Sequence, residues 1–389
     1  MSIPMDLRLN PYPWYGEMLK HSPVAYNEQY GAYMVFRYDD VRSVFQDYKT
    51  FSSALYDGLS EELTFDSQIQ ALDHPRHTQL RALATHAFTP KAVADLEPRI
   101  RTIAGSLIDA MLTGQDIDFV KQFAVPFPVT VIAEMLGVPE KDFERFKHWS
   151  DIIVEISERL LTGQTEELPE HIAAYRDLKQ YFQSLIHQRR TEPQNDLISR
   201  LAAAEADGEK LTDLEASNFC SLLLVTGNET TTNLLANLIR TFAEHPEQWK
   251  LLQRNRDLIP QAVEEVLRFR TPVQLMFRLV TKETEISGTK LSPGDRVAVF
   301  LGAANRDPAK FERPDVFDIT RPSGPHLTFG HGIHFCLGAP LARLETSIAL
   351  QVLLDRIEAF EIPAAEALEP LTSFNLLGLR KLPLAIKFK

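Results

Sequence analysis

The chain of 389 residues has only two cysteines, Cys220 and Cys336. They could form one bridge at most, which excludes a disulfide-built fold. Long apolar runs are also missing: the stretch Phe219–Val225 is far shorter than the roughly 20 residues that cross a bilayer. The start, MSIPMDLRLNPYPWY, has no basic segment followed by an apolar one, so no secretory signal is visible. We therefore expect a cytoplasmic protein with no membrane span.

Positive charge is scarce, because 41 Lys and Arg residues face 53 Asp and Glu residues and leave a formal net charge of −12. This balance disfavours nonspecific binding to nucleic acid or to anionic lipid. Hydrophobic residues make up 44% and charged residues 24%, a composition that excludes disorder as the main state. With no internal repeat and no Gly/Ser linker visible, we expect one domain over residues 1–389.

Helical spacing of apolar residues dominates the chain, so the predicted class is mainly α with a minor β portion. Strands are expected in a small N-terminal part, about 1–50, and again at about 278–300. Phe51–Leu72 is irregular and reads as a long loop. The predicted helices are His77–Leu112 with a break near Thr89–Pro90, Asp118–Leu136, Phe143–Arg190 with a break around Thr162–Pro169, Leu258–Arg270 and Ala339–Phe360.

One further helix should be unusually long. Thr212 and Glu215 form a capping-box pattern, which marks a helix start. From there to Glu244 a continuous helix would be ~45 Å long at 1.5 Å per residue. That length is enough to cross a whole domain.

The segment Phe329–Gly338 surrounds Cys336 with three glycines, and Ala339-Pro340 then opens a helix. The helix dipole and the free backbone N–H groups favour a thiolate at such a position. Glycines let the backbone fold tightly, so that amides can point at the sulfur and tune a bound metal. Taken alone, Cys336 could also be a small buried residue in a turn. A zinc site is the other alternative, since three histidines lie nearby: His326, His331 and His334.

Read as a whole, this loop resembles the haem-ligand loop of the cytochromes P450, the haem-thiolate monooxygenases. The family pattern is Phe, two residues, Gly, three residues, Cys, one residue, Gly, filled here by Phe329, Gly332, Cys336 and Gly338. The resemblance implies the P450 fold, with haem between the long central helix and the final helix. It makes Cys336 the iron ligand and Phe329 a haem contact.

The long helix has polar residues within an apolar sequence, from Thr226 to Thr232. Gly227 lowers helix propensity by ~1 kcal/mol against alanine, and a threonine hydroxyl can bond the carbonyl one turn back, so a kink is expected here. The segment also resembles the family's oxygen-binding helix, which makes Glu229 and Thr230 the acid–alcohol pair that delivers protons to O2. The same resemblance places Gly227 at the cofactor site, where the kinked backbone at Thr226–Gly227 would leave room for O2. Thr226 departs from the Ala or Gly usual in the family.

Charged residues elsewhere match the family's supporting positions. Glu265 and Arg268 lie three residues apart on one helix face and correspond to its Glu-x-x-Arg pair, with Arg321 as the expected third partner. We expect these three to form a buried network that fixes the cysteine loop. Four other residues match positions that contact the haem propionates in the family: His77, Arg81, Arg278 and His334.

The function implied is insertion of one oxygen atom of O2 into an apolar organic substrate, by hydroxylation or epoxidation. The cofactor would be haem b, with electrons from NAD(P)H through an external ferredoxin and its reductase, and the chain would act as a monomer. Arg76 and Arg343 are candidates for a basic patch that docks the ferredoxin. Three alternatives stay open: a peroxide-driven peroxygenase, a haem-thiolate sensor or binding protein, and a zinc hydrolase.

The substrate is not defined by the sequence, and terpenoids, fatty acids, steroids and polyketides all stay open. Leu, Met and Phe dominate the pieces nearest the expected haem, which suits an apolar ligand. By family position the pocket would use Phe51–Leu72, parts of Ile152–Tyr181, Leu222–Thr226, Val273–Phe277 and Phe374–Leu377.

Overall fold

The computed structural model describes residues 5–55, 69–114, 116–161, 168–206, 209–363 and 368–389. The chain divides into two compact units. The first unit contains Met1–Leu55, Ala104–Ala124 and Thr230–Lys389, and the second contains Tyr56–Ile103 and Val125–Glu229. The boundary between the units falls within two helices, α5 (Glu97–Leu112) and α10 (Asp213–Glu244), so each helix has residues in both units.

The first unit is built around a mixed five-stranded sheet in the order β1-β2-β10-β7-β3, in which β2 and β10 are parallel and the other neighbours antiparallel. Its helices in the described part of the chain are α1 (Tyr12–His21), α2 (Tyr38–Gln46), α11 (Pro246–Arg254), α12 (Ile259–Phe269), α13 (Leu301–Ala304) and α14 (Ala339–Arg356). The sheet strands are β1 (Val24–Asn27), β2 (Ala32–Val35), β3 (Phe51–Ser52), β7 (Leu275–Val280) and β10 (Arg296–Phe300).

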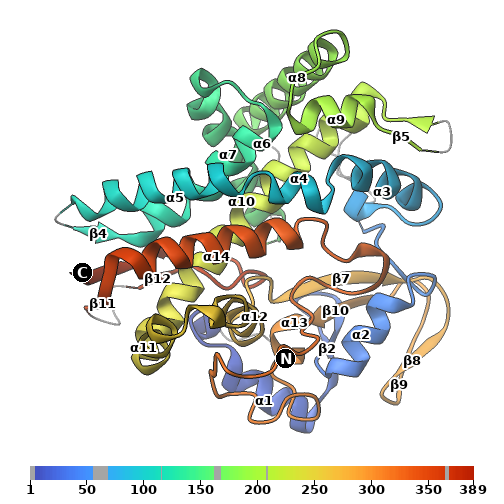
Figure 1. Ribbon diagram of the computed structural model, residues 1–389. Coiled ribbons are helices and arrows are strands. Elements are labelled where there is room, and N and C mark those ends of the chain that lie inside the picture. The colour runs from blue at the N-terminus through green and yellow to red at the C-terminus, as the bar shows by residue number, and fades with distance from the viewer. Residues whose placement is uncertain (1–4, 56–68, 115, 162–167, 207–208, 364–367) are drawn as a thin grey trace. The chain divides into compact units, whose positions relative to one another are not determined.

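Alternation along the central strands gives this sheet an apolar cluster on each face. Along β10, Val297 and Val299 join the cluster that includes Val41 and Val44 of α2. Ala298 and Phe300 point the other way and join the cluster that includes residues of α1. Helices α1 and α2 therefore cover opposite faces, and Figure 1 shows α2 beside β2 and β10.

Smaller strands complete the first unit. A hairpin of β8 (Thr284–Ile286) and β9 (Thr289–Leu291) turns at Ser287 and Gly288, both of which have positive φ. A three-stranded sheet joins β11 (Ile357–Glu361), β14 (Pro383–Phe388) and β4 (Ile117–Asp118). The remaining pair is β12 (Glu369–Pro370) with β13 (Leu379–Lys381).

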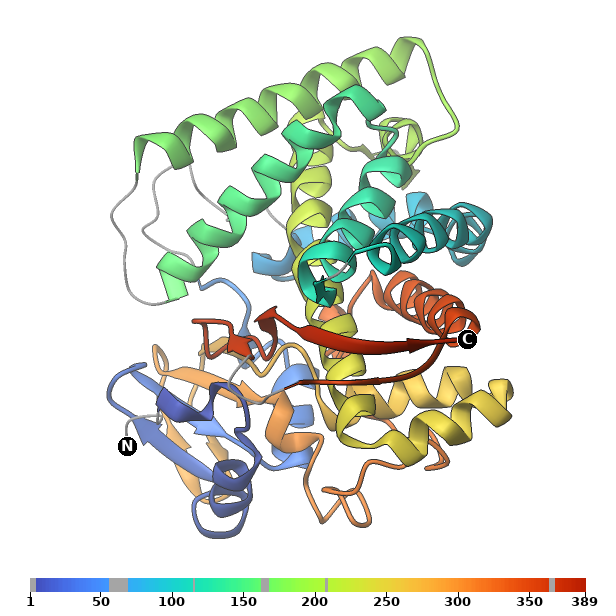
Figure 2. The ribbon, with the colours of Figure 1, turned by 90° about the vertical axis from the view of Figure 1, so that its left-hand side faces the viewer.

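The second unit is helical apart from one short hairpin among its described residues, β5 (Glu205–Ala206) with β6 (Glu209–Lys210). Helices α7 and α8 pack side by side, as Figure 2 shows. Its helices are α3 (Arg76–Ala87), α4 (Pro90–Ala94), α6 (Pro126–Leu136), α7 (Phe143–Leu161), α8 (Pro169–Thr191) and α9 (Leu197–Ala203).

Several predicted helix ends are confirmed by local bonds. The break near Thr89 follows from a helix cap, because its hydroxyl accepts a hydrogen bond from the Ala92 amide at 3.1 Å. Helix α10 starts at the predicted capping box: the Glu215 amide donates to the Thr212 hydroxyl at 3.2 Å, and the Thr212 amide donates to the Glu215 carboxylate at 3.0 Å.

Two predicted helices are wrong in part. The final helix ends at Arg356 rather than Phe360, because Ile357–Glu361 forms β11 and pairs with β14. Asp118–Leu136 is not one helix: Asp118 lies in β4, a π-helical turn follows over Val120–Ala124, and α6 begins at Pro126. Within the predicted loop Phe51–Leu72, the strand β3 and a 3₁₀ turn over Ile69–Ala71 are present, and residues 56–68 lie outside the described part.

Candidate active site

The cysteine loop of the first unit is closed by a backbone hydrogen bond from the Cys336 amide to the Phe329 carbonyl, 2.9 Å long. The Cys336 thiol is free of disulfides and exposed, three residues before the first residue of α14. Gly332 is required on two grounds: its φ is +73°, and a Cβ there would lie 2.5 Å from the Phe45 carbonyl oxygen. The loop is therefore seated directly on the end of α2.

The irregular segment before Phe329 is fixed to α12 by buried polar bonds. The Asn305 side chain accepts from the Leu327 amide at 2.7 Å and donates to the Thr328 hydroxyl at 2.9 Å. That hydroxyl in turn donates to the Leu267 carbonyl at 2.8 Å. These bonds position the start of the cysteine loop against α12, and none of them involves a glycine of the loop.

The predicted Glu265–Arg268–Arg321 network is confirmed. Arg268 donates two hydrogen bonds to the Glu265 carboxylate, at 2.8 and 2.9 Å, and both side chains are 3% exposed. Arg321 donates to the same carboxylate at 3.1 Å. Its other nitrogens, and those of Arg268, bond backbone carbonyls between residues 305 and 316. The network therefore ties α12 to the irregular segment that leads into the cysteine loop.

Helix α10 is continuous across Thr226 and Gly227. The Thr226 hydroxyl donates to the Leu222 carbonyl one turn back, at 2.8 Å, as expected for a threonine inside a helix. A Cβ on Gly227 would lie 2.7 Å from the tip of Ile132, so this glycine lets α6 approach α10 closely. Glu229 and Thr230 follow as consecutive, half-buried residues of the same helix.

One acidic residue near this part of α10 was missed at the sequence level. Glu345 of α14 is 1% exposed and hydrogen-bonded to Thr231, the neighbour of Thr230. Burial raises the pKa of Glu345 well above its usual range, so this carboxyl is held in its neutral form. The signal was an acidic residue within the buried stripe of Leu341, Ile348 and Val352, at helical spacing.

The four residues expected at the propionates fall in both units. His77 and Arg81 lie one turn apart on α3 of the second unit. Burial, with a smaller effect of Arg81, lowers the pKa of His77 to about 4, so His77 is a neutral hydrogen-bonding group rather than a cation at pH 7. In the first unit His334 ends a 3₁₀ turn within the cysteine loop, and Arg278 lies inside β7 rather than opening it. The Arg278 guanidinium is 5.2 Å from the centre of the Phe45 ring, which places it near the loop's seat on α2.

A zinc site at the histidines is contradicted by the geometry. All of the histidines and the cysteine concerned are described, and nowhere in the described ranges do three His, Cys, Asp or Glu side chains gather as metal ligands. His326 contacts the Glu264 carboxylate instead, at 3.1 Å. The two arginines expected on a ferredoxin-docking patch are both in ion pairs, Arg76 with Glu215 and Arg343 with Glu264.

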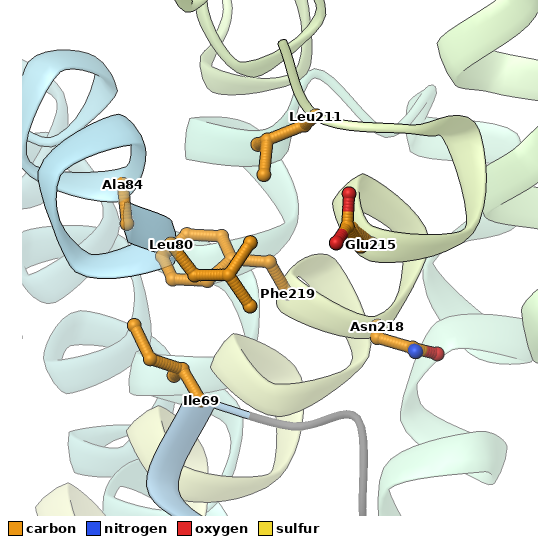
Figure 3. A pocket seen from close by; sticks show the side chains of 7 residues that line it. All are labelled: Ile69, Leu80, Ala84, Leu211, Glu215, Asn218 and Phe219. Carbon is orange, nitrogen blue, oxygen red and sulfur yellow. The ribbon is translucent and has the colours of Figure 1, made fainter. Parts of the chain in front are cut away.

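In the second unit a small open hollow lies between α3 and the first turns of α10 (Figure 3). Its wall on α10 ends at Phe219, about two turns before Thr226. Seven residues line it: Ile69, Leu80, Ala84, Leu211, Glu215, Asn218 and Phe219. The lining is mostly apolar, and Glu215 on its rim is bound to Arg76 and to Thr212.

Within the described ranges, every helix is too short or too polar to pass through a lipid bilayer.

Comparisons with known proteins agree with this architecture. The family model described as cytochrome P450 matches residues 15–388. Cytochrome P450 109 from Bacillus spizizenii is 42% identical over 387 residues, which cover 98% of this chain and 93% of that protein. Erythromycin C-12 hydroxylase from Saccharopolyspora erythraea is 42% identical over 377 residues, covering 95% and 93%. The crystal structure of CYP109E1 from Bacillus megaterium in complex with testosterone has a TM-score of 0.87 at 41% identity, covering 97% of this chain and 99% of that one.

The chain therefore belongs to the cytochrome P450 family, and its fold is the P450 fold. Hydroxylases and epoxidases among its relatives make it a P450 monooxygenase, an enzyme of a family that uses haem, O2 and electrons from redox partners. The residues of the first unit suit a haem: an exposed thiol at Cys336 stands beside Phe335, an apolar ring left 41% exposed. A haem is flat and largely apolar and takes a thiolate as ligand, so it would cover both Cys336 and Phe335.

Proposed function

We propose that this P450 binds haem b through the Cys336 thiolate and inserts one oxygen atom of O2 into an apolar organic substrate, with electrons from NAD(P)H through a ferredoxin and its reductase. The whole chain, residues 1–389, would act as one functional domain and as a monomer. The observation that supports the proposal most is the Cys336 loop. An exposed thiol is held at a helix start by the Phe329 carbonyl, and the glycine at 332 is required by close approach of α2.

The thiolate form of Cys336 is the one that binds iron, and its position before α14 favours that form. When bound, the haem supplies the O2 and C–H chemistry, while the protein supplies ligation, orientation and protons. We assign the propionates to His77, Arg81, Arg278 and His334. Burial lowers the pKa of His77, whereas a propionate beside it would raise that pKa, and the ring N–H can donate a hydrogen bond to the propionate in either protonation state.

Proton delivery is assigned to Glu229 and Thr230. When one oxygen atom of O2 enters the substrate, reduction of the other atom to water consumes two electrons and two protons. Adjacent carboxyl and hydroxyl groups on α10 can pass these protons inward. The backbone around Gly227 allows this stretch of α10 to lie close to α6, and the Thr226 hydroxyl is already engaged by the Leu222 carbonyl. Thr226 is therefore not assigned a role in moving protons.

Electrons are proposed to come from a separate protein, because two cysteines cannot supply the four thiolates of an iron–sulfur cluster. Since Arg76 and Arg343 are both paired with glutamates, neither offers an uncompensated charge to an acidic ferredoxin. Docking is therefore expected to depend on other cations.

For the substrate we propose a multi-ring or macrocyclic apolar molecule. Two relatives support this size class: one is named for hydroxylation of erythromycin, and the other was crystallised with testosterone. Testosterone is the first probe, because a steroid that enters the pocket displaces water near the iron and shifts the Soret band.

The deciding experiment compares oxidant supply for the haem-loaded enzyme with testosterone under ¹⁸O2. Ferredoxin, reductase and NADPH are given in one reaction and hydrogen peroxide alone in another. Product carrying one ¹⁸O atom only in the first reaction supports the proposal. Product in the peroxide reaction and none in the reaction with ferredoxin, reductase and NADPH would establish a peroxygenase and overturn the proposal. Bound testosterone that gives no product in either reaction would favour a sensor or binding protein.

A further inference from the structure

A second carboxylate of α12, next to the network glutamate, is bound from two sides. Arg343 of α14 donates two hydrogen bonds to Glu264, from Nε at 2.6 Å and from Nη2 at 2.9 Å. The ring Nε2 of His326 lies 3.1 Å from the same carboxylate. Glu264 thus joins two segments on either side of Cys336 in the chain, ten residues before it and seven after it.

The protonation of these groups follows from their bonds. The Thr328 amide points at Nδ1 of His326 at 3.4 Å, so the ring proton is assigned to Nε2 and is donated to Glu264. Burial alone would raise the pKa of Glu264, but the hydrogen bonds from Arg343 and His326 lower it to about 2. At neutral pH Glu264 is therefore a carboxylate that faces the Arg343 guanidinium.

The guanidinium is also stacked on the cysteine loop. Its central carbon lies 4.5 Å from the centre of the Phe329 ring, within the range of a cation–π contact. Phe329 is the residue whose carbonyl accepts the hydrogen bond from the Cys336 amide. Glu264 and Arg343 are 21% and 36% exposed, so water screens the pair only in part.

We propose that Glu264 is a positioning residue for the redox centre, which holds the Arg343 guanidinium on Phe329 and cancels its charge, and thereby sets the reduction potential of the iron. This inference rests on the proposed ligation by Cys336. The charges around a thiolate ligand tune its metal, and this pair places two charges next to the loop. The His326 ring keeps the carboxylate oriented.

Removing either charge should move the potential in a direction set by the charge that remains. Glu264→Gln leaves an uncompensated cation beside the loop, which favours the ferrous state and makes the potential more positive. Arg343→Gln leaves an uncompensated anion and makes it more negative. A purely structural role predicts that both substitutions loosen the same loop and shift the potential in the same direction.

The test is spectroelectrochemical titration of the substrate-free holoenzyme, which needs no redox partner. We expect opposite shifts for the two single variants, and for Glu264→Gln combined with Arg343→Gln a potential close to that of the wild type. The matched control is Glu358→Gln, which breaks an exposed pair with Lys387 (2.7 Å) in the same unit and should leave the potential unchanged.

Shifts of one sign in both single variants, or no shift in either, would overturn the proposal. The carbon monoxide complex of the ferrous wild type, recorded on the same samples, separates this failure from that of the proposed function. A thiolate-type band with unmoved potentials removes only the role of Glu264. A wild type that lacks the band removes the ligand and this inference together. If Arg343→Gln does not fold, Arg343→Lys, which keeps the charge, should retain the wild-type potential while Glu264→Gln shifts it.

Discussion

Glu265 is the residue whose removal should destabilise the first unit most. Its carboxylate accepts four hydrogen bonds: two from Arg268, one from Arg321 and one, at 3.2 Å, from the Asp318 amide. In Glu265→Gln one carboxylate oxygen is replaced by an NH2 group, a donor that faces other donors. Arg268 then keeps its charge at 3% exposure with only neutral oxygens as hydrogen-bond acceptors. Breaking a buried ion pair from one side costs about 3–5 kcal/mol. That is a large share of the roughly 5–15 kcal/mol that stabilises a typical protein.

Urea unfolding of the haem-free protein, followed by circular dichroism, measures this cost without any contribution from haem binding. The control is Glu97→Gln, which removes the partner of Arg101 in a helical pair whose side chains are 50% and 43% exposed. That change should cost less than about 0.5 kcal/mol. If the two variants lose similar amounts of unfolding free energy relative to the wild type, the buried network does not stabilise the fold more than an exposed pair does.

Three further predictions concern the loop, the proton path and a buried acid. Gly332→Ala should abolish haem uptake, because the added Cβ would clash with the Phe45 carbonyl. Uptake is measured as the ratio of Soret to protein absorbance. Normal uptake would contradict the close contact between the cysteine loop and α2. Thr230→Ala should bind haem and substrate but convert NADPH electrons to hydrogen peroxide, and a peroxide yield unchanged from the wild type would count against its role. In the wild type, stability should fall as pH rises above the ordinary carboxyl pKa of ~4.3 towards the raised pKa of Glu345, by up to about 1.4 kcal/mol per pH unit. Glu345→Gln should lack this loss, so its stability relative to the wild type increases with pH in urea unfolding; parallel curves would refute the buried neutral acid.

The sequence predicted correctly those helices and helix ends that depend on residues close together in the chain. The start of α10 follows from Thr212 and Glu215, which bond each other across one turn. The early end of α14 was not predictable in this way, because Ile357 leaves the helix to pair with Phe388 at the far end of the chain. Asp118 behaves similarly: it pairs with Pro383 rather than starting a helix. The paired residues are 31 residues apart in the first case and 265 in the second, and such pairing leaves no periodic signal in either partner.

The residues of the site also differ in how far the sequence could predict them. Cys336 and its glycines form a contiguous motif, so sequence alone singled them out. Glu264 and Arg343 are 79 residues apart on different helices, and each looks like an ordinary surface charge until α12 and α14 are packed together. Glu345 could have been noticed as an acid in an apolar stripe, but its contact with Thr231 depends on how α14 meets α10.

The central claim, iron held by the sulfur of Cys336, is tested most directly by the absorption spectrum of the dithionite-reduced protein under carbon monoxide. Thiolate ligation predicts a strongly red-shifted Soret band in the wild type and its loss in Cys336→Ala. A wild-type band at the position given by a nitrogen ligand, or a red-shifted band that persists in Cys336→Ala, would contradict the account.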